Sequence, residues 1–276
     1  MANICENNSL IIKQILIQGF EILNNYYFRR MKEYQDVVTD RFNNNEEDLN
    51  DSIYSPNHPI GKYSRKYLFT GLSVFVDWFI NKQGSLKDKK VLDVGCGSGE
   101  ILSFFAARGF LPENLQGIDL SDTRIQRALK QYPNFNFKCG DALNFHLDDE
   151  KFDLITSFDL FSHMKFEQEI ITGLKNVNHH LQEDGLFLWY DIFSKDHYSA
   201  PENSDSWGFN KRQMINLAQK AGFELVYYRP FFKLFFNKYH SVYQVKRFPP
   251  IMVRIMEKIL PGSPGNMLMI LRKNKY

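Results

Sequence analysis

The chain has 276 residues, of which 43% are hydrophobic and 15% aromatic, enough to bury the core of one large α/β domain with additional segments. No run reaches the about 18 consecutive apolar residues of a membrane-spanning helix, and the N-terminus lacks the pattern of a secretory signal. Three cysteines without paired or metal-type spacing indicate a reducing compartment. We therefore expect a cytoplasmic protein with no disulfide and no metal site.

The N-terminal third is predicted to be helical. Residues 9–41 carry apolar side chains at intervals of three and four, which favours one or two helices. An acidic, polar linker at 43–51 and a proline-containing loop at 53–61 follow, and the helical pattern returns at 63–81. We interpret residues 1–82 as a helical cap or lid and residues 83–276 as the main domain. The alternative is that these helices only cover the sheet.

The stretch at 90–100, KVLDVGCGSGE, organises the rest of the chain. A short apolar run at 91–94 predicts a buried parallel strand, glycines at 95, 97 and 99 predict a tight turn, and 101–108 continues as a helix. Such a turn brings backbone N–H groups and the positive end of the helix dipole close to a ligand. The spacing differs from the G-x-G-x-x-G of dinucleotide-binding turns.

Three further predicted strands end on residues suited to a nucleotide. Residues 115–120 end near Asp119, whose carboxylate can accept both ribose hydroxyls, and 135–142 close on Asp141. Residues 152–158 end at Phe158. Ser121 or Asp122 is expected to cap the helix at 123–132 rather than to bind a ligand.

Together, the G-x-G-x-G turn with its leading Asp93 and these strand ends resemble, in order over residues 90–191, the class I S-adenosylmethionine-dependent methyltransferases. The resemblance implies a Rossmann-like α/β fold: a seven-stranded, mostly parallel sheet with helices on both faces and an antiparallel last strand at 267–273. The implied cofactor is S-adenosyl-L-methionine. The positions that match the family's cofactor contacts are Asp93, Gly95, Cys96, Gly97, Asp119, Leu120, Asp141, Ala142 and Phe158.

The C-terminal half adds a predicted helix at 165–181, a turn at 183–185, a strand at 185–191, a long loop at 192–209, a helix at 210–221 and a strand at 223–230. An insertion at 231–266 precedes the last strand and is rich in aromatic and basic residues. Residues 229–276 carry ten Lys/Arg and one acid, a charge of +9 that leaves −7 for the rest. This segment suits a phosphate-bearing substrate, an anionic membrane surface or nucleic acid, or else contributes to the core or a homodimer contact.

The chemistry implied is the transfer of a methyl group, which needs a base only when the acceptor must lose a proton. His163 and Asp191 are the candidate bases. Their alternative roles are to orient the loop and to hydrogen-bond to the adjoining loop. Tyr63, Arg65 and Trp207 are weaker candidates for contacts with the substrate, and Tyr63 or Arg65 is also placed to meet the cofactor carboxylate.

Three functions remain open. The first is methylation of a small molecule, at oxygen, such as a natural-product or sugar-type acceptor. The second is a nucleic-acid methyltransferase, disfavoured because residues 158–161 lack the Asn-Pro-Pro-aromatic or Asp-Pro-Pro-aromatic quartet of amino-methylating enzymes. The third is a non-catalytic, cofactor-binding partner protein. The acceptor is not specified, because the segments at 53–67, 192–209 and 231–266 carry no motif.

Overall fold

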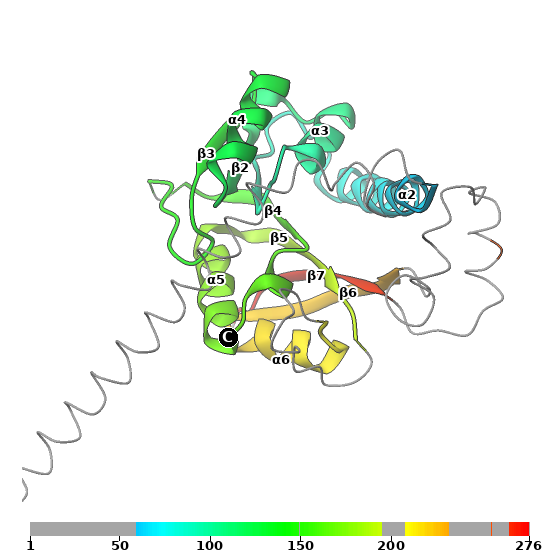
Figure 1. Cartoon of the computed structure of the whole chain (residues 1–276), viewed down its shortest axis with the longest axis vertical. Helices are drawn as coiled ribbons and strands as arrows, with labels where there is room; N and C mark the ends of the chain where they lie inside the picture. The colour runs from blue at the N-terminus through cyan, green and yellow to red at the C-terminus, as the bar shows by residue number, and fades with distance from the viewer. Residues whose placement is uncertain (1–58, 149, 195–207, 232–254, 256–264, 276) are drawn as a thin grey trace, which may run out of the picture. The chain divides into compact units, whose positions relative to one another are not determined.

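The computed structural model describes residues 59–148, 150–194, 208–231, 255 and 265–275, with side chains from residue 65 onward (Figure 1). All of them belong to one compact unit, Asn43–Tyr276. The helices predicted at 9–41, the acidic linker and most of the insertion at 231–266 lie outside the described residues, as do 195–207 of the long loop.

A seven-stranded sheet with strand order β3-β2-β1-β4-β5-β7-β6 forms the centre of the described unit (Figure 1). Its strands are β1 Val91–Val94, β2 Leu115–Asp119, β3 Asn136–Cys139, β4 Phe152–Phe158, β5 Leu181–Ile192, β6 Phe223–Phe231 and β7 Asn266–Lys273. The first five strands pair in parallel, and β7 runs antiparallel to both β5 and β6. The predicted fold class and the antiparallel last strand are confirmed.

Helices cover both faces of this sheet. Helices α2 Pro59–Gln83, α3 Glu100–Ala107 and α4 Asp122–Gln131 pack on one face, where they form a core with alternate residues of the strands. Helices α5 Glu167–His180 and α6 Lys211–Lys220 pack on the other face and form a second core. Two short 3₁₀ turns, η2 Pro112–Asn114 and η3 Phe161–His163, join these elements. The alternating burial follows from the pleat, since successive strand residues face opposite sides.

Helix α2 belongs to the predicted cap, and it packs directly on the sheet. Leu72, Val76 and Phe79 are almost completely buried in the core that α2 shares with α3 and the strands. At Gly71 the helix approaches the end of β6 so closely that a Cβ atom would lie 2.8 Å from Cζ of Phe231. Only glycine permits this contact without a shift of the ring or the helix.

Two element boundaries differ from the sequence-based predictions. Strand β3 ends at Cys139, so Asp141 lies in the turn that follows rather than in the strand. Strand β5 begins at Leu181, and the predicted turn at 183–185 is an irregular bulge within it, because β5 pairs from Phe152 to Leu181 and resumes from Leu154 to Leu186. The exposed side chains of Gln182 to Asp184 explain why these residues resemble a turn.

No helix among residues 59–148, 150–194, 208–231 and 265–275 is long and apolar enough to cross a bilayer.

Candidate functional site

The glycine turn after β1 has the conformation that its sequence predicts. Gly95, Gly97 and Gly99 all have positive φ, at 78°, 53° and 86°. The backbone N–H groups of Gly95 and Cys96 donate to the carbonyl of Ile118 at 2.8 and 2.9 Å, which fastens the turn to β2. A Cβ atom on Gly99 would lie 2.7 Å from the ring of Phe137, so a larger residue would collide with the core. Among the described residues, a Cβ atom on Gly97 would have only Arg124 Nη1 within 4 Å, at 3.9 Å, so the described structure leaves space above this glycine.

Asp119 at the end of β2 completes this turn. Its Oδ2 accepts the Gly97 N–H at 2.8 Å, and its Oδ1 accepts the Ser121 N–H at 2.9 Å. Each carboxylate oxygen keeps a lone pair for another donor, such as a hydroxyl. Leu120 follows directly and is 39% exposed, which places an apolar side chain beside the carboxylate. Ser121 caps α4 by accepting the Arg124 N–H at 3.3 Å, as predicted.

Arg124 is a residue that sequence reasoning missed. It lies in the first turn of α4, and its guanidinium faces Gly97. Burial lowers its pKa, while the nearby Asp119 carboxylate and Cys96 oppose that shift. The signal available in the sequence was its spacing, five residues after the acid at the end of β2. The arginine therefore adds a positive charge beside the glycine turn.

Asp93, at the centre of the motif, is enclosed in the core. It is 1% exposed, and its Oδ1 accepts the Thr156 hydroxyl at 2.6 Å across the β1–β4 pair. Burial raises the pKa of Asp93 to about 7, opposed by the Thr156 hydrogen bond and reinforced by the Asp119 carboxylate. Cys96 next to the turn is also buried, and burial raises the pKa of its thiol. Asp93 is therefore placed to support the turn from below.

The turn after β3 brings Asp141 and Ala142 to the same edge. The Gly140 N–H donates to the Asp119 carbonyl at 2.9 Å, which joins the ends of β2 and β3. Asp141 Oδ1 accepts the Leu143 N–H at 2.9 Å, so the side chain closes its own turn. Ala142 is 8% exposed.

Phe158 ends β4 beside these loops. Its ring stacks on Tyr190 with centroids 5.3 Å apart. Tyr190 in turn meets Phe231 edge-on at 5.7 Å, and the guanidinium of Arg229 lies 5.1 Å from the Phe231 centroid. Cross-strand aromatic contacts of this kind fix ring orientations. Phe158 therefore stands at the exposed end of an aromatic row that extends under α2.

Asp191, the second candidate base, is fully buried and held by three donors. Its Oδ2 accepts the indole N–H of Trp189 at 3.0 Å and the Ser162 N–H at 3.1 Å, and its Oδ1 accepts the Ile192 N–H at 3.1 Å. Burial raises its pKa to about 6, although these hydrogen bonds oppose the shift. These contacts match its alternative role, a link between β5 and the segment after β4. A role as a base stays a prediction.

The segment after β4 carries His163, the first candidate base. His163 ends the 3₁₀ turn η3, is half-buried, and donates its backbone N–H to the Leu160 carbonyl at 3.0 Å. Sequence reasoning missed Asp159, which has a positive φ of 50° that non-glycine residues seldom adopt. Its exposed side chain accepts from Asn266 Nδ2 at 3.3 Å, so the ends of β4 and β7 meet here. Strained residues of this kind cluster at active sites.

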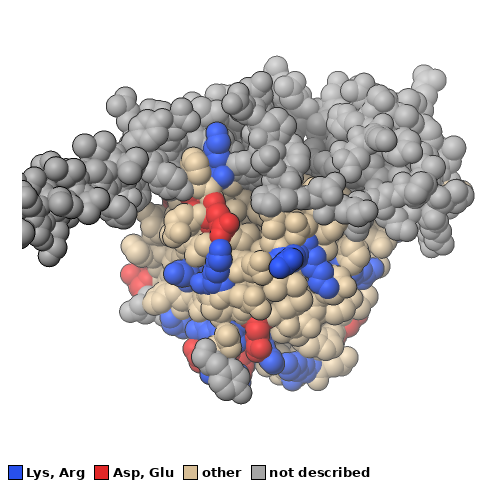
Figure 2. Space-filling view, turned by 90° about the horizontal axis from the view of Figure 1, so that it is seen from below, with Lys and Arg blue, Asp and Glu red and all other residues tan. Residues whose placement is uncertain are grey.

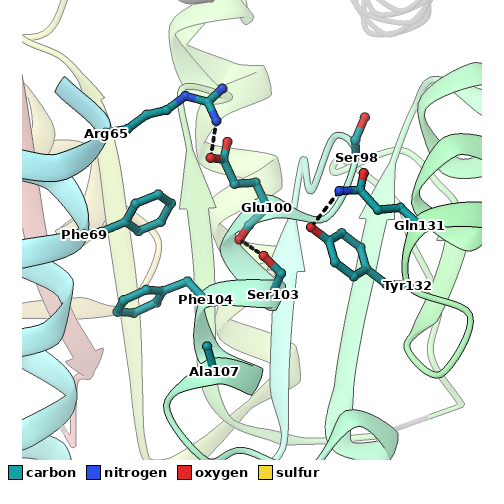
Figure 3. Close-up of a pocket in the computed structure, with 9 residues that line it drawn as sticks. All are labelled: Arg65, Phe69, Ser98, Glu100, Ser103, Phe104, Ala107, Gln131 and Tyr132. Carbon is teal, nitrogen blue, oxygen red and sulfur yellow. Dashed lines mark hydrogen bonds and ion pairs between the residues drawn. The ribbon is translucent and has the colours of Figure 1, made fainter. Parts of the chain in front are cut away.

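Arg65 from α2 lies over the start of α3, where it forms an ion pair with Glu100 (Figure 3). The two line a pocket of about 500 Å³ together with Ser98, the stacked pair Phe69 and Phe104, Ser103, Ala107, Gln131 and Tyr132. Ser98 belongs to the glycine turn, so this pocket separates Arg65 from that turn (Figure 3). The side chain of Tyr63 and all of Trp207 lie outside the described residues, and their predicted substrate contacts stay predictions.

The structure brings most of the predicted cofactor positions together at the carboxyl edge of β1 to β4. This is the edge at which ligands bind in open parallel sheets. Among the residues that the structure describes, no group of three His, Cys, Asp or Glu side chains is arranged to hold a metal ion.

Comparison with known proteins shows what the region around this site is similar to. Residues 91–185 match the family model described as "Methyltransferase domain". A ubiquinone biosynthesis O-methyltransferase from Coxiella burnetii is 32% identical over 118 residues, which are 41% of this chain and 48% of that protein. The chain therefore spans about half the length of the curated relatives it matches.

Solved structures share the fold at low sequence identity. Magnesium protoporphyrin IX methyltransferase from Synechocystis PCC 6803, with bound SAH, has a TM-score of 0.58 at 15% identity and covers 87% of this chain and all of that one. The [4+2]-cyclase SpnF has a TM-score of 0.53 at 16% identity, over 72% of this chain and 80% of that one. Residues 91–185 therefore match a methyltransferase domain, and the described unit has the fold of the class I S-adenosylmethionine-dependent methyltransferases. The cyclase shows that the fold is also the scaffold of another reaction.

Proposed function

We propose that this protein is an enzyme that binds S-adenosyl-L-methionine and transfers its methyl group to a small-molecule acceptor at oxygen. The observation that carries the proposal is the glycine turn whose Gly97 N–H is held by the Asp119 carboxylate at 2.8 Å. This contact holds Asp119, the proposed ribose-binding acid, against the backbone of the glycine turn that would face the ligand. The O-methyltransferase activity named for the curated relatives supports the choice of oxygen.

The residues present fit the proposed cofactor. The open space above Gly97 admits a ligand against the backbone, and Asp119 retains lone pairs for two hydroxyls. The exposed Leu120 offers an apolar surface for the adenine ring. Asp141 would accept the adenine amino group, and the Ala142 N–H would meet a ring nitrogen. Arg65 would pair with the amino-acid carboxylate after release from Glu100.

When bound, the cofactor supplies a sulfonium methyl group that is displaced in line and leaves a neutral thioether. The protein's part is to hold the acceptor oxygen in line with that methyl, and such alignment contributes roughly 7–11 kcal/mol in well-oriented reactions. An alcohol or phenol must also lose its proton. We assign that step to His163, which stands beyond Phe158 at the same edge. Asp191 would then act by holding the segment that carries His163, through its bond to the Ser162 N–H.

Calorimetric titration with S-adenosylhomocysteine, the demethylated product, tests the first part of this proposal. We expect saturable binding with one site per chain. Incubation with methyl-tritiated cofactor and a panel of catechols, phenols and sugars then tests the transfer, and labelled product is expected in the phenolic or sugar set. Binding without transfer to any member of a broad panel would favour the non-catalytic alternative. Absence of binding would refute the assignment of the site.

The nucleic-acid alternative gains no support from the described surface. Figure 2 shows one face, on which Lys and Arg side chains are spread among acidic ones rather than gathered into a stripe. Several of the described basic residues are paired with acids, as in Arg272 with Glu224 and Lys273 with Glu183. Most of the +9 segment lies outside the described residues. A salt titration of nucleic-acid binding would test this alternative against the small-molecule function, because the affinity of phosphate contacts falls steeply with salt.

A further inference from the structure

The loop that follows β3, residues 140–145, is fastened to the site at its beginning and to a distant helix at its far end. We call it the adenine-side loop. At its start, Gly140 donates to the Asp119 carbonyl, and Asp141 closes a turn over Leu143 and Asn144. These bonds orient the first residues only. Something else must hold the remainder, since Ala142 would present its N–H to the purine.

That hold comes from Asn176, near the C-terminal end of α5. Its side-chain amide Nδ2 donates to the Ala142 carbonyl at 3.3 Å and to the Phe145 carbonyl at 3.4 Å. One amide group therefore bridges two carbonyls of the adenine-side loop and ties them to the helix. Asn176 is half-buried and lies far from the glycine turn in sequence.

The preceding turn of α5 allows the loop to approach. A Cβ atom on Gly173 would lie 3.7 Å from the Ala142 carbonyl oxygen and 3.0 Å from the Phe161 ring, with Met164 at 3.6 Å. The same turn of helix thus contacts the adenine-side loop on one side and the segment that carries His163 on the other. Glycine keeps these two contacts close.

Packing holds the side chain of Phe145 at the far end of the loop, where its ring is buried and stacks on His180 with centroids 4.8 Å apart. A cavity of about 320 Å³ opens beside Asn176, lined by His146, Leu147, Asp148, His179 and His180. If the amide bonds are lost, the loop has space into which to move. The two hydrogen bonds from Asn176 therefore add a polar restraint on the backbone of the loop to the packing of Phe145.

We propose that Asn176 is a positioning residue for the cofactor's base: by holding the Ala142 carbonyl it sets the loop that distinguishes adenine from other purines. The proposal rests on the proposed function, because it assumes that adenine binds at Asp141 and Ala142. Asn176 acts through Ala142 and touches no ligand. The same turn of α5, which begins at Gly173, also contacts the segment that carries His163. Helix α5 therefore connects that segment with the adenine-side loop.

Asn176→Asp tests the proposal, because it keeps the size of the side chain but turns two donors into a carboxylate oxygen facing two carbonyls. We expect affinity for S-adenosylhomocysteine to fall about tenfold, as for the loss of one or two buried hydrogen bonds. The preference for this ligand over S-inosylhomocysteine, which has an oxygen in place of the 6-amino group, should fall as well. Both are measured by calorimetry on the full chain, with the melting temperature recorded. Asn176→Ala, which adds no charge, serves if the first variant does not fold and should show the same losses.

Asn178→Asp is the matched control. Asn178 lies on the same helix, and its amide donates to the Gly222 carbonyl at 3.0 Å, away from the loop. It should alter stability but neither affinity nor purine preference. Wild-type affinity and preference in the Asn176 variants would overturn the proposal, and so would an equal loss of preference in Asn178→Asp. If the wild type binds neither ligand, the proposed function itself has failed.

Discussion

The two halves of the sheet's carboxyl edge are held together by different kinds of contact. In the half formed by β1, β2 and β3, the loops are joined by backbone groups, as when Gly95 and Cys96 donate to Ile118 and Gly140 donates to Asp119. In the half formed by β4, β5 and β7, buried or partly buried side chains add to backbone bonds such as that from the Asp159 N–H to the Tyr190 carbonyl at 2.9 Å. There Trp189 donates to Asp191, and Asn266 donates to Asp159.

This difference decides what a substitution changes. A backbone hydrogen bond survives the exchange of a side chain, so the cofactor half tolerates many residues as long as the glycines and Asp119 remain. A buried side-chain acceptor cannot be replaced by its neighbours, and its removal leaves donors unsatisfied. Substitutions in the second half should therefore cost mainly stability, whereas those in the first half should cost mainly cofactor affinity.

The largest effect is expected for Asp191→Ala. It leaves three N–H donors without their acceptor, among them the indole of the completely buried Trp189. Even though the buried carboxyl itself is costly, we expect a loss of about 2–4 kcal/mol in the free energy of unfolding, measured by urea denaturation. The exposed Asp184→Ala on the same strand is the control and should change stability by less than about 0.5 kcal/mol. If Asp191→Ala lost no more unfolding free energy than Asp184→Ala, side-chain contacts would not be what stabilises the half formed by β4, β5 and β7.

Asp119→Ala should act mainly on binding. The variant removes the acceptor for the Gly97 and Ser121 N–H groups and the proposed ribose contact together. We expect affinity for S-adenosylhomocysteine to fall at least about tenfold, or 1.4 kcal/mol. Asp122→Ala, three residues along and exposed in the first turn of α4, is the matched control and should bind normally. Unchanged affinity in Asp119→Ala would refute the ribose assignment.

The last effect appears only as a pH dependence. The pKa of Asp93 rises from 3.8 to about 7 on folding because the carboxyl is buried. The folded chain therefore binds this proton more tightly than the unfolded chain, and stability falls as the pH rises from 3.8 towards 7. Asp93→Asn removes the titration. Relative to wild type it should gain stability progressively as the pH rises from about 4 to about 7, measured in thermal melts. A pH-independent difference would mean that Asp93 is ionised in the native state.

Sequence reasoning predicted the first half well because its rules are local. A strand, three glycines and a following helix occupy the continuous stretch 91–107, and glycine adopts the positive φ found at Gly95, Gly97 and Gly99 without steric cost. Asp119 was found because a strand end and its acid are adjacent in the chain. The cap at Ser121 has the same local origin.

The second half and the supporting contacts depend on distant partners and could not be predicted in this way. The enclosure of Asp191 requires a backbone N–H from Ser162, and the hold on Ala142 requires an amide from Asn176, 34 residues away. No spacing rule links such pairs. The bulge in β5 was predicted as a turn because its exposed polar residues and Gly185 carry the composition of one. Tyr63 and Trp207 keep the status of predictions.

The contact at Gly71 limits how helix α2 is able to move. Gly71 packs against the ring of Phe231 near the middle of the helix. The C-terminal half of the helix is fixed in the core by the buried side chains of Leu72, Val76 and Phe79. If the whole helix moved along the sheet, it would displace the ring of Phe231. A movement that separates Arg65 from Glu100 should therefore be a bend of the N-terminal turns of α2 at Gly71.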